Sequence, residues 1–462
     1  MSLIDRIINR LNLSDTKKKV VRNLAWAVTG KVITLLGSLL VGIFVARYLG
    51  PEQYGLMSYV TSFIALFQVF ASFGLDNIEI REEAKCEGQG EEKHIPSPEC
   101  NTILGTAFTL KLIFAAITMV LVIATAWIFE ADTFTKWMIT LYSFSMIMQT
   151  FGVIRNYFTS IVWNEYIVKT EISRTIIGAA IKVVLLLLHA PLVWFIAATL
   201  FDTILIASGY LISYNKKISS IRLWTYNPTT ARNLLKEAFP LLLSGAAVII
   251  YQRIDQVMIG NMIDKEAVGY YSVAEAIAGV VIFIPTTLCQ TFNPILVQLH
   301  NSNETRYKKE AQSFMDITVW LSIIICICIS LCAPWLIKWM FGTQYLPAIV
   351  LLQICVFKTI GYALAQVSAT IILTEGTQKW IAIRNLAGCA SAVLLNLILL
   401  PRCGVLGAAI ASVITAIITG YLIHPFIPSY REVFCMQTKS IFLGAKSLFN
   451  INHILKFNNS KQ

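Results

Sequence analysis

The chain has 462 residues, of which 56% are hydrophobic and only 14% are charged. Soluble domains carry fewer apolar and more charged residues, so the composition excludes a water-soluble globular protein and predicts an integral membrane protein. The net charge of +11 does not require a nucleic-acid partner. The basic residues gather in short polar segments between apolar runs, which is the usual topological signal of a membrane protein. We therefore expect membrane lipids, and no nucleic acid, as partners.

Apolar segments long enough to cross a bilayer recur along the whole chain. A helix needs about 20 apolar residues to span about 30 Å of hydrocarbon, and about twelve segments qualify. In chain order they are residues 25–48, 55–76, 104–129, 136–158, 173–189, 192–213, 237–260, 267–297, 312–337, 347–374, 381–400 and 404–427. The sequence thus predicts an all-α integral membrane fold of about 12 transmembrane helices. We assign helices 1–6 to an N-terminal lobe (1–214), helices 7–12 to a C-terminal lobe (237–430), and the remainder to a cytoplasmic linker (215–236) and a cytoplasmic tail (431–462).

Both ends of the chain are expected on the cytoplasmic side. Short cytoplasmic loops retain Lys and Arg, and roughly 27 of the 37 basic residues fall in the N-terminal segment, alternate loops and the tail. The first residues are charged and no cleavage site follows them, so the first span is expected to be a retained anchor. Apolar residues at helical spacing between Leu3 and Leu11 predict an interfacial helix. The tail after Pro428 reads as a surface-bound helix or as disorder.

Five cations inside the apolar segments are the candidate binding residues. A cation at the centre of a spanning helix costs roughly 2.5–3.5 kcal/mol even on the lenient insertion scale, so five together indicate a polar interior that holds an anion. Arg suits a site where two phosphate oxygens are bound together. The alternative for each residue is an internal ion pair or a lysine that reaches the membrane surface. The five are Lys31, Lys111, Lys182, Arg253 and Lys358.

Three acidic residues also lie well inside the predicted spans, namely Asp202, Asp255 and Glu275. One interpretation pairs them with Arg253 or Lys358. The other assigns one of them to Na⁺ or a proton that drives the transport cycle, because carboxylates within a membrane commonly serve as relays. No other cofactor and no metal site is expected, since the histidines have no metal-ligand spacing.

A short motif occurs twice at one fixed offset. Gly50-Pro51-Glu52-Gln53-Tyr54-Gly55-Leu56-Met57-Ser58 is similar to Asp264-Lys265-Glu266-Ala267-Val268-Gly269-Tyr270-Tyr271-Ser272, with Glu, Gly and Ser in matching positions. Both copies follow an outward-running helix and precede an inward-running one. This agreement predicts two six-helix halves of the same orientation, as in transporters that rock about a central site. The alternative is chance similarity between two short amphipathic loops.

The same segments carry a family resemblance. They are Arg47-Tyr48-Leu49-Gly50-Pro51-Glu52-Gln53-Tyr54-Gly55, Gly74-Leu75-Asp76 with Arg81-Glu82, Ile103-Leu104-Gly105-Thr106-Ala107-Phe108, and the stretch from Arg253 to Gly260 continued by Val268-Gly269-Tyr270-Tyr271. Together they resemble the Wzx-type polysaccharide flippases, the O-antigen transporters of the multidrug/oligosaccharidyl-lipid/polysaccharide (MOP) exporter superfamily. The match covers most of the chain, although the later spans match mainly in hydropathy.

The resemblance implies two six-helix bundles of the MOP type in a bacterial inner membrane. It further implies that the chain moves an undecaprenyl-diphosphate-linked oligosaccharide, an O-antigen or related repeat unit of lipopolysaccharide biosynthesis, from the cytoplasmic to the periplasmic leaflet by alternating access. The polysaccharide polymerase and the chain-length machinery are the candidate protein partners. A lipid-linked diphosphate with its sugar cannot cross hydrocarbon unaided, so a cationic, hydrogen-bonding chamber between the lobes would suit it.

Three other functions are weighed against this one. A lipid II flippase is the closest rival, but proteins of that kind usually have about fourteen spans, more than the number predicted here. A multidrug cation antiporter of the same superfamily should favour intramembrane acids over bases. A membrane glycosyltransferase or polymerase would need a large outer domain or loop, whereas every predicted outer connection is short. We therefore expect a transporter and not an enzyme.

Overall fold

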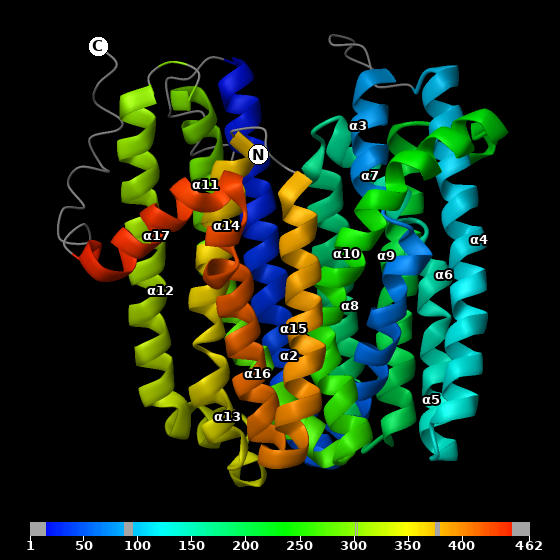
Figure 1. The fold of residues 1–462 in the computed structure, drawn as a ribbon. Coiled ribbons are helices and arrows are strands. Elements are labelled where there is room, and N and C mark those ends of the chain that lie inside the picture. Colours follow the sequence, from blue (N-terminus) through cyan, green and yellow to red (C-terminus); the bar gives the residue numbers. More distant parts are fainter. Residues whose placement is uncertain (1–14, 87–95, 301, 303, 375–378, 446–462) are drawn as a thin grey trace. The chain divides into compact units, whose positions relative to one another are not determined.

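The computed structural model describes residues 15–86, 96–300, 302, 304–374 and 379–445, and every regular element in them is helical (Figure 1). The predicted interfacial helix at Leu3–Leu11 lies outside these residues. The α-helices are α2 (Asp15–Ser72), α3 (Asp76–Cys86), α4 (Pro98–Phe129), α5 (Thr133–Ser143), α6 (Ser145–Gln149), α7 (Gly152–Ser160), α8 (Asn164–Leu187), α9 (Leu192–Lys217), α10 (Pro228–Met262), α11 (Lys265–His300), α12 (Glu304–Met340), α13 (Ala348–Cys355), α14 (Lys358–Thr374), α15 (Lys379–Cys403), α16 (Val405–Ile417) and α17 (Arg431–Leu443).

The chain divides into two compact units. Unit 1 contains the residues up to Leu49 together with Val60–Ile249, and unit 2 contains Gly50–Tyr59 together with the residues from Ile250 onward. The divisions therefore fall inside α2 and α10. The lobe boundaries expected from the sequence, with a linker at 215–236, stay a prediction.

Ten helical segments of the described residues are long and apolar enough to cross a membrane, which confirms a multi-pass all-α fold. The first, Thr29–Cys86, has 58 residues and contains two of the predicted spans. They meet at Gly50, whose backbone is not helical (φ 73°, ψ 171°). The predicted span 173–189 lies in α8, which is not among the ten because Glu171, Arg174 and Lys182 interrupt its apolar sequence.

Two predicted spans are interrupted rather than continuous. The span 136–158 consists of α5, α6 and α7, with a break at Thr150 and Phe151. The hydroxyl of Thr150 donates to the carbonyl of Ile147 at 2.7 Å, a local bond that competes with regular helix bonding. The span 347–374 breaks between α13 and α14, so that Lys358 is the first residue of α14. Both breaks lie beside polar side chains described below.

The residues expected as a linker pack against α4 in unit 1. The backbone N–H of Thr225 donates to the carbonyl of Asn101, and that of Asn227 to the hydroxyl of Thr106 at 3.1 Å. Gly105 lies directly against the backbone of Thr225, where a side chain on the glycine would collide. The segment between α9 and α10 is thus anchored to the core of its own unit.

The tail of unit 2 begins with α17, which runs across the neighbouring helices rather than along them (Figure 1). The indole of Trp320 on α12 donates to the carbonyl of Ser440 at 2.9 Å. Val433 and Gln437 are buried beneath the helix. Of the two alternatives considered for the start of the tail, the structure shows a docked helix.

The two copies of the repeated motif pack against each other in unit 2. Gly55 lies against the backbone of Lys265 and Gly269, and Gly269 lies against the backbone of Pro51. A Cβ on Gly55 would stand 2.7 Å from the backbone nitrogen of Gly269, which real structures do not tolerate. Small residues let transmembrane helices approach to backbone contact, so both glycines are required by packing.

Gly269→Val is expected to destabilise the protein by about 1–3 kcal/mol or more. The new side chain would collide with main-chain atoms, which cannot move aside by a change of rotamer. Gly279→Val on the same helix is the control, since nothing lies within 4 Å of a Cβ there. The measurement is the thermal unfolding midpoint and the monodisperse yield in detergent. Equal midpoints for the two variants would contradict the packing of the repeated corners.

Candidate functional site

A largely buried charge cluster lies in unit 1, where α3 begins. Phe73 and Gly74 adopt left-handed backbone conformations (φ 51° and 69°), which end α2 and turn the chain into α3. A Cβ on Gly74 would lie 2.7 Å from the backbone nitrogen of Leu242, so glycine is needed for both conformation and space. The turn places Asp76 and Glu79 in the first turn of α3, where carboxylates also suit the helix dipole.

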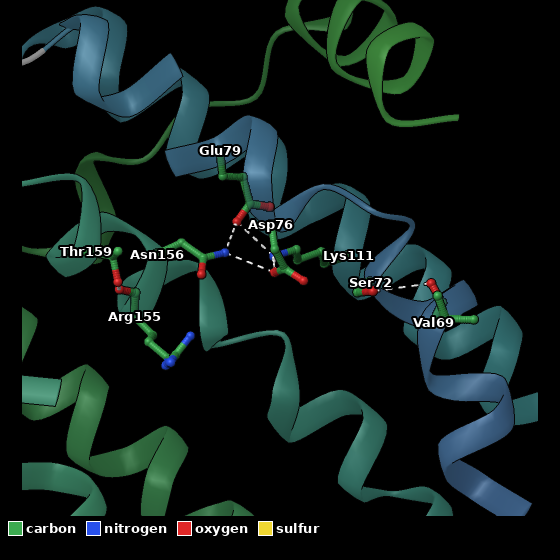
Figure 2. Close-up of polar contacts among 8 residues, drawn as sticks. All are labelled: Val69, Ser72, Asp76, Glu79, Lys111, Arg155, Asn156 and Thr159. Carbon is green, nitrogen blue, oxygen red and sulfur yellow. Dashed lines mark hydrogen bonds and ion pairs between the residues drawn. The ribbon is translucent and has the colours of Figure 1, made fainter. Parts of the chain in front are cut away.

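Lys111 on α4 is held between these two carboxylates (Figure 2). Its ammonium lies 2.7 Å from Asp76 Oδ1 and 2.8 Å from Glu79 Oε2. Asn156 on α7 donates to the same oxygens at 2.9 Å and 2.6 Å. The Lys111 side chain is 3% exposed and that of Glu79 is fully buried. One cation and two carboxylates leave the cluster with a formal charge of −1 when all three are ionised.

A cavity of about 270 Å³ in unit 1 opens onto this cluster. Asp76, whose side chain is half exposed, and Lys111 line it together with Gln68, Ser72, Gln149 and Thr150, and apolar groups complete the wall. The carbonyl oxygen of the Gln68 side chain is buried and has no hydrogen-bond partner among the described residues. The cavity thus offers polar groups to a polar ligand. Because the adjacent cluster of Asp76, Glu79 and Lys111 has a net negative charge when all three are ionised, it favours a cation or a hydroxylated group over an anion.

Lys182 forms a second ion pair in unit 1. Its ammonium lies 2.6 Å from Asp202 Oδ2, joining α8 to α9. Gly178 on α8 leaves the space that Asp202 occupies, since a side chain there would collide with the carboxylate. Asp202 was expected to pair with Arg253 or Lys358 or to bind a coupling ion, and the structure pairs it with Lys182 instead.

Unit 2 holds the third pair, in which Lys358 at the start of α14 binds Glu275 on α11. Asp255 on α10 interacts electrostatically with Lys358 and Glu275, but its hydrogen-bond partners are different residues. Its oxygens accept from Tyr271 Oη and Asn396 Nδ2, each at 2.7 Å. The expected pairing of Glu275 with Lys358 is confirmed, whereas Asp255 is held by neutral donors rather than by Arg253.

Lys31 and Arg253 are the two predicted cations that remain exposed. Neither side chain makes an ion pair within the part of the chain that the structure describes. Both lie in helices that can span a membrane, Lys31 in unit 1 and Arg253 in unit 2. The five predicted cations are therefore not one cluster: three are paired with carboxylates on different helix pairs, and two are open to a ligand. Their role in substrate binding stays a prediction.

Sequence reasoning missed the acidic half of the Lys111 cluster. Residues 77–103 fall between the predicted spans 55–76 and 104–129, yet Ile78, Glu79 and Glu83 are buried within α3. The available signal was the spacing of Asp76 and Glu79 directly after Gly74, which puts both carboxylates on one face of a helix. Asn156 gave no comparable signal, because its position depends on the break before α7.

Two family models match the sequence. A model described as "Polysaccharide biosynthesis protein" matches residues 20–300, which is more than half of the chain, and a model described as "MatE" matches residues 240–399. The first match covers enough of the chain to show that the chain belongs to that family. A search of curated protein sequences finds no match to the chain.

Solved structures of MOP transporters are similar to this fold. An inward-facing multidrug resistance transporter of the MATE family is 15% identical, with a TM-score of 0.67 over 88% of this chain and 96% of its own. The lipid II flippase MurJ in an inward closed conformation is 13% identical, with a TM-score of 0.67 over 94% and 99%. A MOP transporter from Pyrococcus furiosus, described as having a binding pocket of reverse polarity, is 13% identical, with a TM-score of 0.58 over 95% and 99%. At this identity they establish the fold.

Removing Lys111 should leave two buried carboxylates without their cation. Lys111→Met is expected to destabilise the protein by about 3–5 kcal/mol. Glu79→Gln added to it should recover part of this loss, because one carboxylate then remains. Lys31→Met is the matched control in the same unit and should change stability by no more than about 0.5 kcal/mol. Thermal unfolding in detergent of these variants, of Glu79→Gln alone and of the unmodified protein measures the coupling between Lys111 and Glu79, and purely additive effects of the two substitutions would argue against the network.

Proposed function

This chain belongs to the polysaccharide biosynthesis protein family, and its fold is similar to that of MOP transporters, so we propose that it is a flippase for undecaprenyl-diphosphate-linked oligosaccharides. It moves the O-antigen or a related repeat unit from the cytoplasmic to the periplasmic leaflet of a bacterial inner membrane, with both termini in the cytoplasm. The polymerase and chain-length machinery would receive the product. The family match over residues 20–300 is the observation that carries this proposal.

The charge distribution supports an anionic substrate at two positions. Lys31 and Arg253 are exposed on spanning helices and have no carboxylate partner within the described residues. A cation facing lipid tails is costly, so both are expected to face water or a ligand. Diphosphate binding to them would replace water by charge-assisted hydrogen bonds, and the fork of Arg253 can hold two phosphate oxygens at once. Alternating access then exposes the bound head first to one side of the membrane and then to the other.

Lys31→Ala combined with Arg253→Ala should block glycan transfer while leaving protein abundance unchanged, because neither side chain supports packing. The exposed Lys338→Ala is the control and should transport normally. The measurement is the accessibility of a labelled undecaprenyl-diphosphate oligosaccharide in proteoliposomes. Full transfer by the double variant would refute the assignment of these two cations.

Asp255 is the best candidate for coupling to a Na⁺ or H⁺ gradient. It is buried, its hydrogen bonds within the described residues come from no cation, and Tyr271 and Asn396 each donate to one of its oxygens. A buried carboxylate in this situation gains from binding a proton or a cation. Asp202 and Glu275 are less suited, since lysines already neutralise them.

Asp255→Asn should therefore abolish the response of transport to an imposed Na⁺ or pH gradient, while substrate binding persists. Tyr271→Phe keeps the charge and removes one hydrogen bond, so it should retain the response. Transport rates in proteoliposomes with and without each gradient make the comparison. An undiminished gradient response in Asp255→Asn would exclude this residue.

A multidrug cation antiporter is the second candidate, because the inner charges are not predominantly basic. The paired lysines Lys111, Lys182 and Lys358 face the carboxylates of Asp76, Glu79, Asp202 and Glu275, and Asp255 adds another. The same proteoliposomes distinguish the two functions. Glycan transfer without efflux of a cationic dye supports the flippase, and dye efflux without glycan transfer supports the antiporter. Transfer of lipid II but not of other lipid-linked glycans would identify a lipid II flippase.

A further inference from the structure

The cavity beside Lys111 lies at the depth of the spanning helices of unit 1. Its lining residues come from α2, α3, α4, α10 and the interrupted segment α5–α7, and each of these belongs to a candidate membrane span. Lys111 lies about 20 Å along α4 from Pro98, at a rise of about 1.5 Å per residue. Polar groups at this depth are costly against lipid chains, so the cavity is expected to face water or a ligand.

Asp76 presents one oxygen to the cavity that the ion pair leaves free. Lys111 and Asn156 both donate to Oδ1 (Figure 2), whereas Oδ2 accepts no hydrogen bond from the described residues. The side chain of Asp76 is 54% exposed, while that of Lys111 is 3% exposed and has its ammonium between two carboxylates. A group that enters the cavity therefore meets a carboxylate oxygen before it meets a cation.

Two glutamine side chains add uncharged polar groups to the wall. Gln68 lies on α2 one turn before Ser72, and Gln149 is the last residue of α6, where the break before α7 leaves its side chain exposed. Neither amide makes a hydrogen bond within the part of the chain that the structure describes. The amide oxygen of Gln68 is buried, but the exposed amide of Gln149 can turn either its donor or its acceptor toward a ligand.

The size and the polar groups of the cavity suit a single sugar ring. Its volume of about 270 Å³ corresponds to roughly nine water molecules at about 30 Å³ each, which is too little for an oligosaccharide. Asp76 accepts hydrogen bonds, and Gln149 both donates and accepts them, so neighbouring hydroxyl groups of one ring can be bound together. The apolar side chains of Val69, Met146 and Ile249 can pack against its C–H groups.

Charge disfavours two other kinds of ligand. An acidic sugar would bring its carboxylate to the free oxygen of Asp76, beside a cluster whose formal charge is already −1, and like charges repel strongly where water is scarce. A metal ion needs several oxygen ligands, whereas Asp76 is the one acidic residue that lines the cavity and the ammonium of Lys111 lies beside it. An uncharged, hydroxylated ring meets neither obstacle.

We propose that this cavity binds one uncharged sugar of the lipid-linked glycan and that Asp76 selects against uronic acids and other acidic sugars. The inference rests on the proposed flippase function and adds a specificity-determining residue to it. Oδ2 of Asp76 accepts from a sugar hydroxyl, and Gln149 binds a neighbouring hydroxyl. The diphosphate is the same in all such substrates, so discrimination between glycans falls to this cavity.

The test compares two undecaprenyl-diphosphate-linked disaccharides, one built from neutral hexoses and the other from the corresponding hexuronic acids. At limiting concentrations the unmodified chain in proteoliposomes should transfer the neutral glycan about tenfold faster than the acidic one. Equal rates, or faster transfer of the acidic glycan, would overturn the inference and leave the flippase proposal standing. Transfer of neither glycan would overturn both.

Two variants assign the discrimination to the cavity. Asp76→Asn removes the charge and keeps an acceptor for Lys111, and Gln149→Lys adds a cation near the free oxygen. Each should reduce the preference for the neutral glycan to about twofold or less. The matched control is Gln290→Lys, on an exposed glutamine of α11 in unit 2 that does not line the cavity, and it should keep the full preference.

The readout is the ratio of the two transfer rates, because a loss of folded protein lowers both rates equally. An unchanged ratio in Gln149→Lys, whose native side chain has no hydrogen bond to lose among the described residues, would overturn the inference even if Asp76→Asn does not fold. An equal change of the ratio in Gln290→Lys would overturn it too, since the effect would then not depend on the cavity.

Discussion

Burying an ammonium group among apolar helices costs several kcal/mol unless a carboxylate lies within hydrogen-bond distance. Three interruptions of the described helices lie beside such groups. The left-handed turn at Phe73 and Gly74 brings Asp76 and Glu79 to Lys111. The break before α7 presents Asn156 to the same oxygens. The break between α13 and α14 makes Lys358 an N-terminal helix residue, an unfavourable position for a cation that Glu275 offsets.

The paired lysines cannot attract a diphosphate as free cations would. A phosphate entering the cavity beside Lys111 meets the half-exposed carboxylate of Asp76 first, and repulsion between the two offsets the attraction of the ammonium. Lys182 and Lys358 are likewise neutralised by Asp202 and Glu275. An ion pair of this kind joins two particular helices. Its lysine is then neutralised and no longer attracts an anionic ligand. In the proposed flippase, attraction of an anionic head would therefore depend on Lys31 and Arg253, and the total number of basic residues in the spans overstates that attraction.

Hydropathy alone was sufficient to predict the all-α membrane class and most of the spans, because the length of an apolar helix is set by bilayer thickness. Lys111 and Lys358, the buried lysines of the described residues, both lie in predicted spans. Hydropathy could not provide the partners, since Asn156 and Asp76 meet only through a turn and a helix break that no periodicity records. Arg384 was not singled out, although it lies inside the predicted span 381–400, and its guanidinium is buried where it donates to the carbonyl of Ala365 on α14.

The two copies of the repeated motif, a weak signal in the sequence, pack against each other in the structure. Three matching residues in two nine-residue segments could arise by chance, yet Gly55 and Gly269 touch through their backbones. This contact assigns Gly50–Tyr59 to unit 2, whereas the residues of α2 on either side belong to unit 1. The chain consequently passes from one unit to the other at three places, before Gly50, after Tyr59 and after Ile249. In an alternating-access cycle these crossings must absorb the change in backbone angles. Gly50 lies at the first of them with a positive φ of 73°, a conformation that glycine adopts without strain.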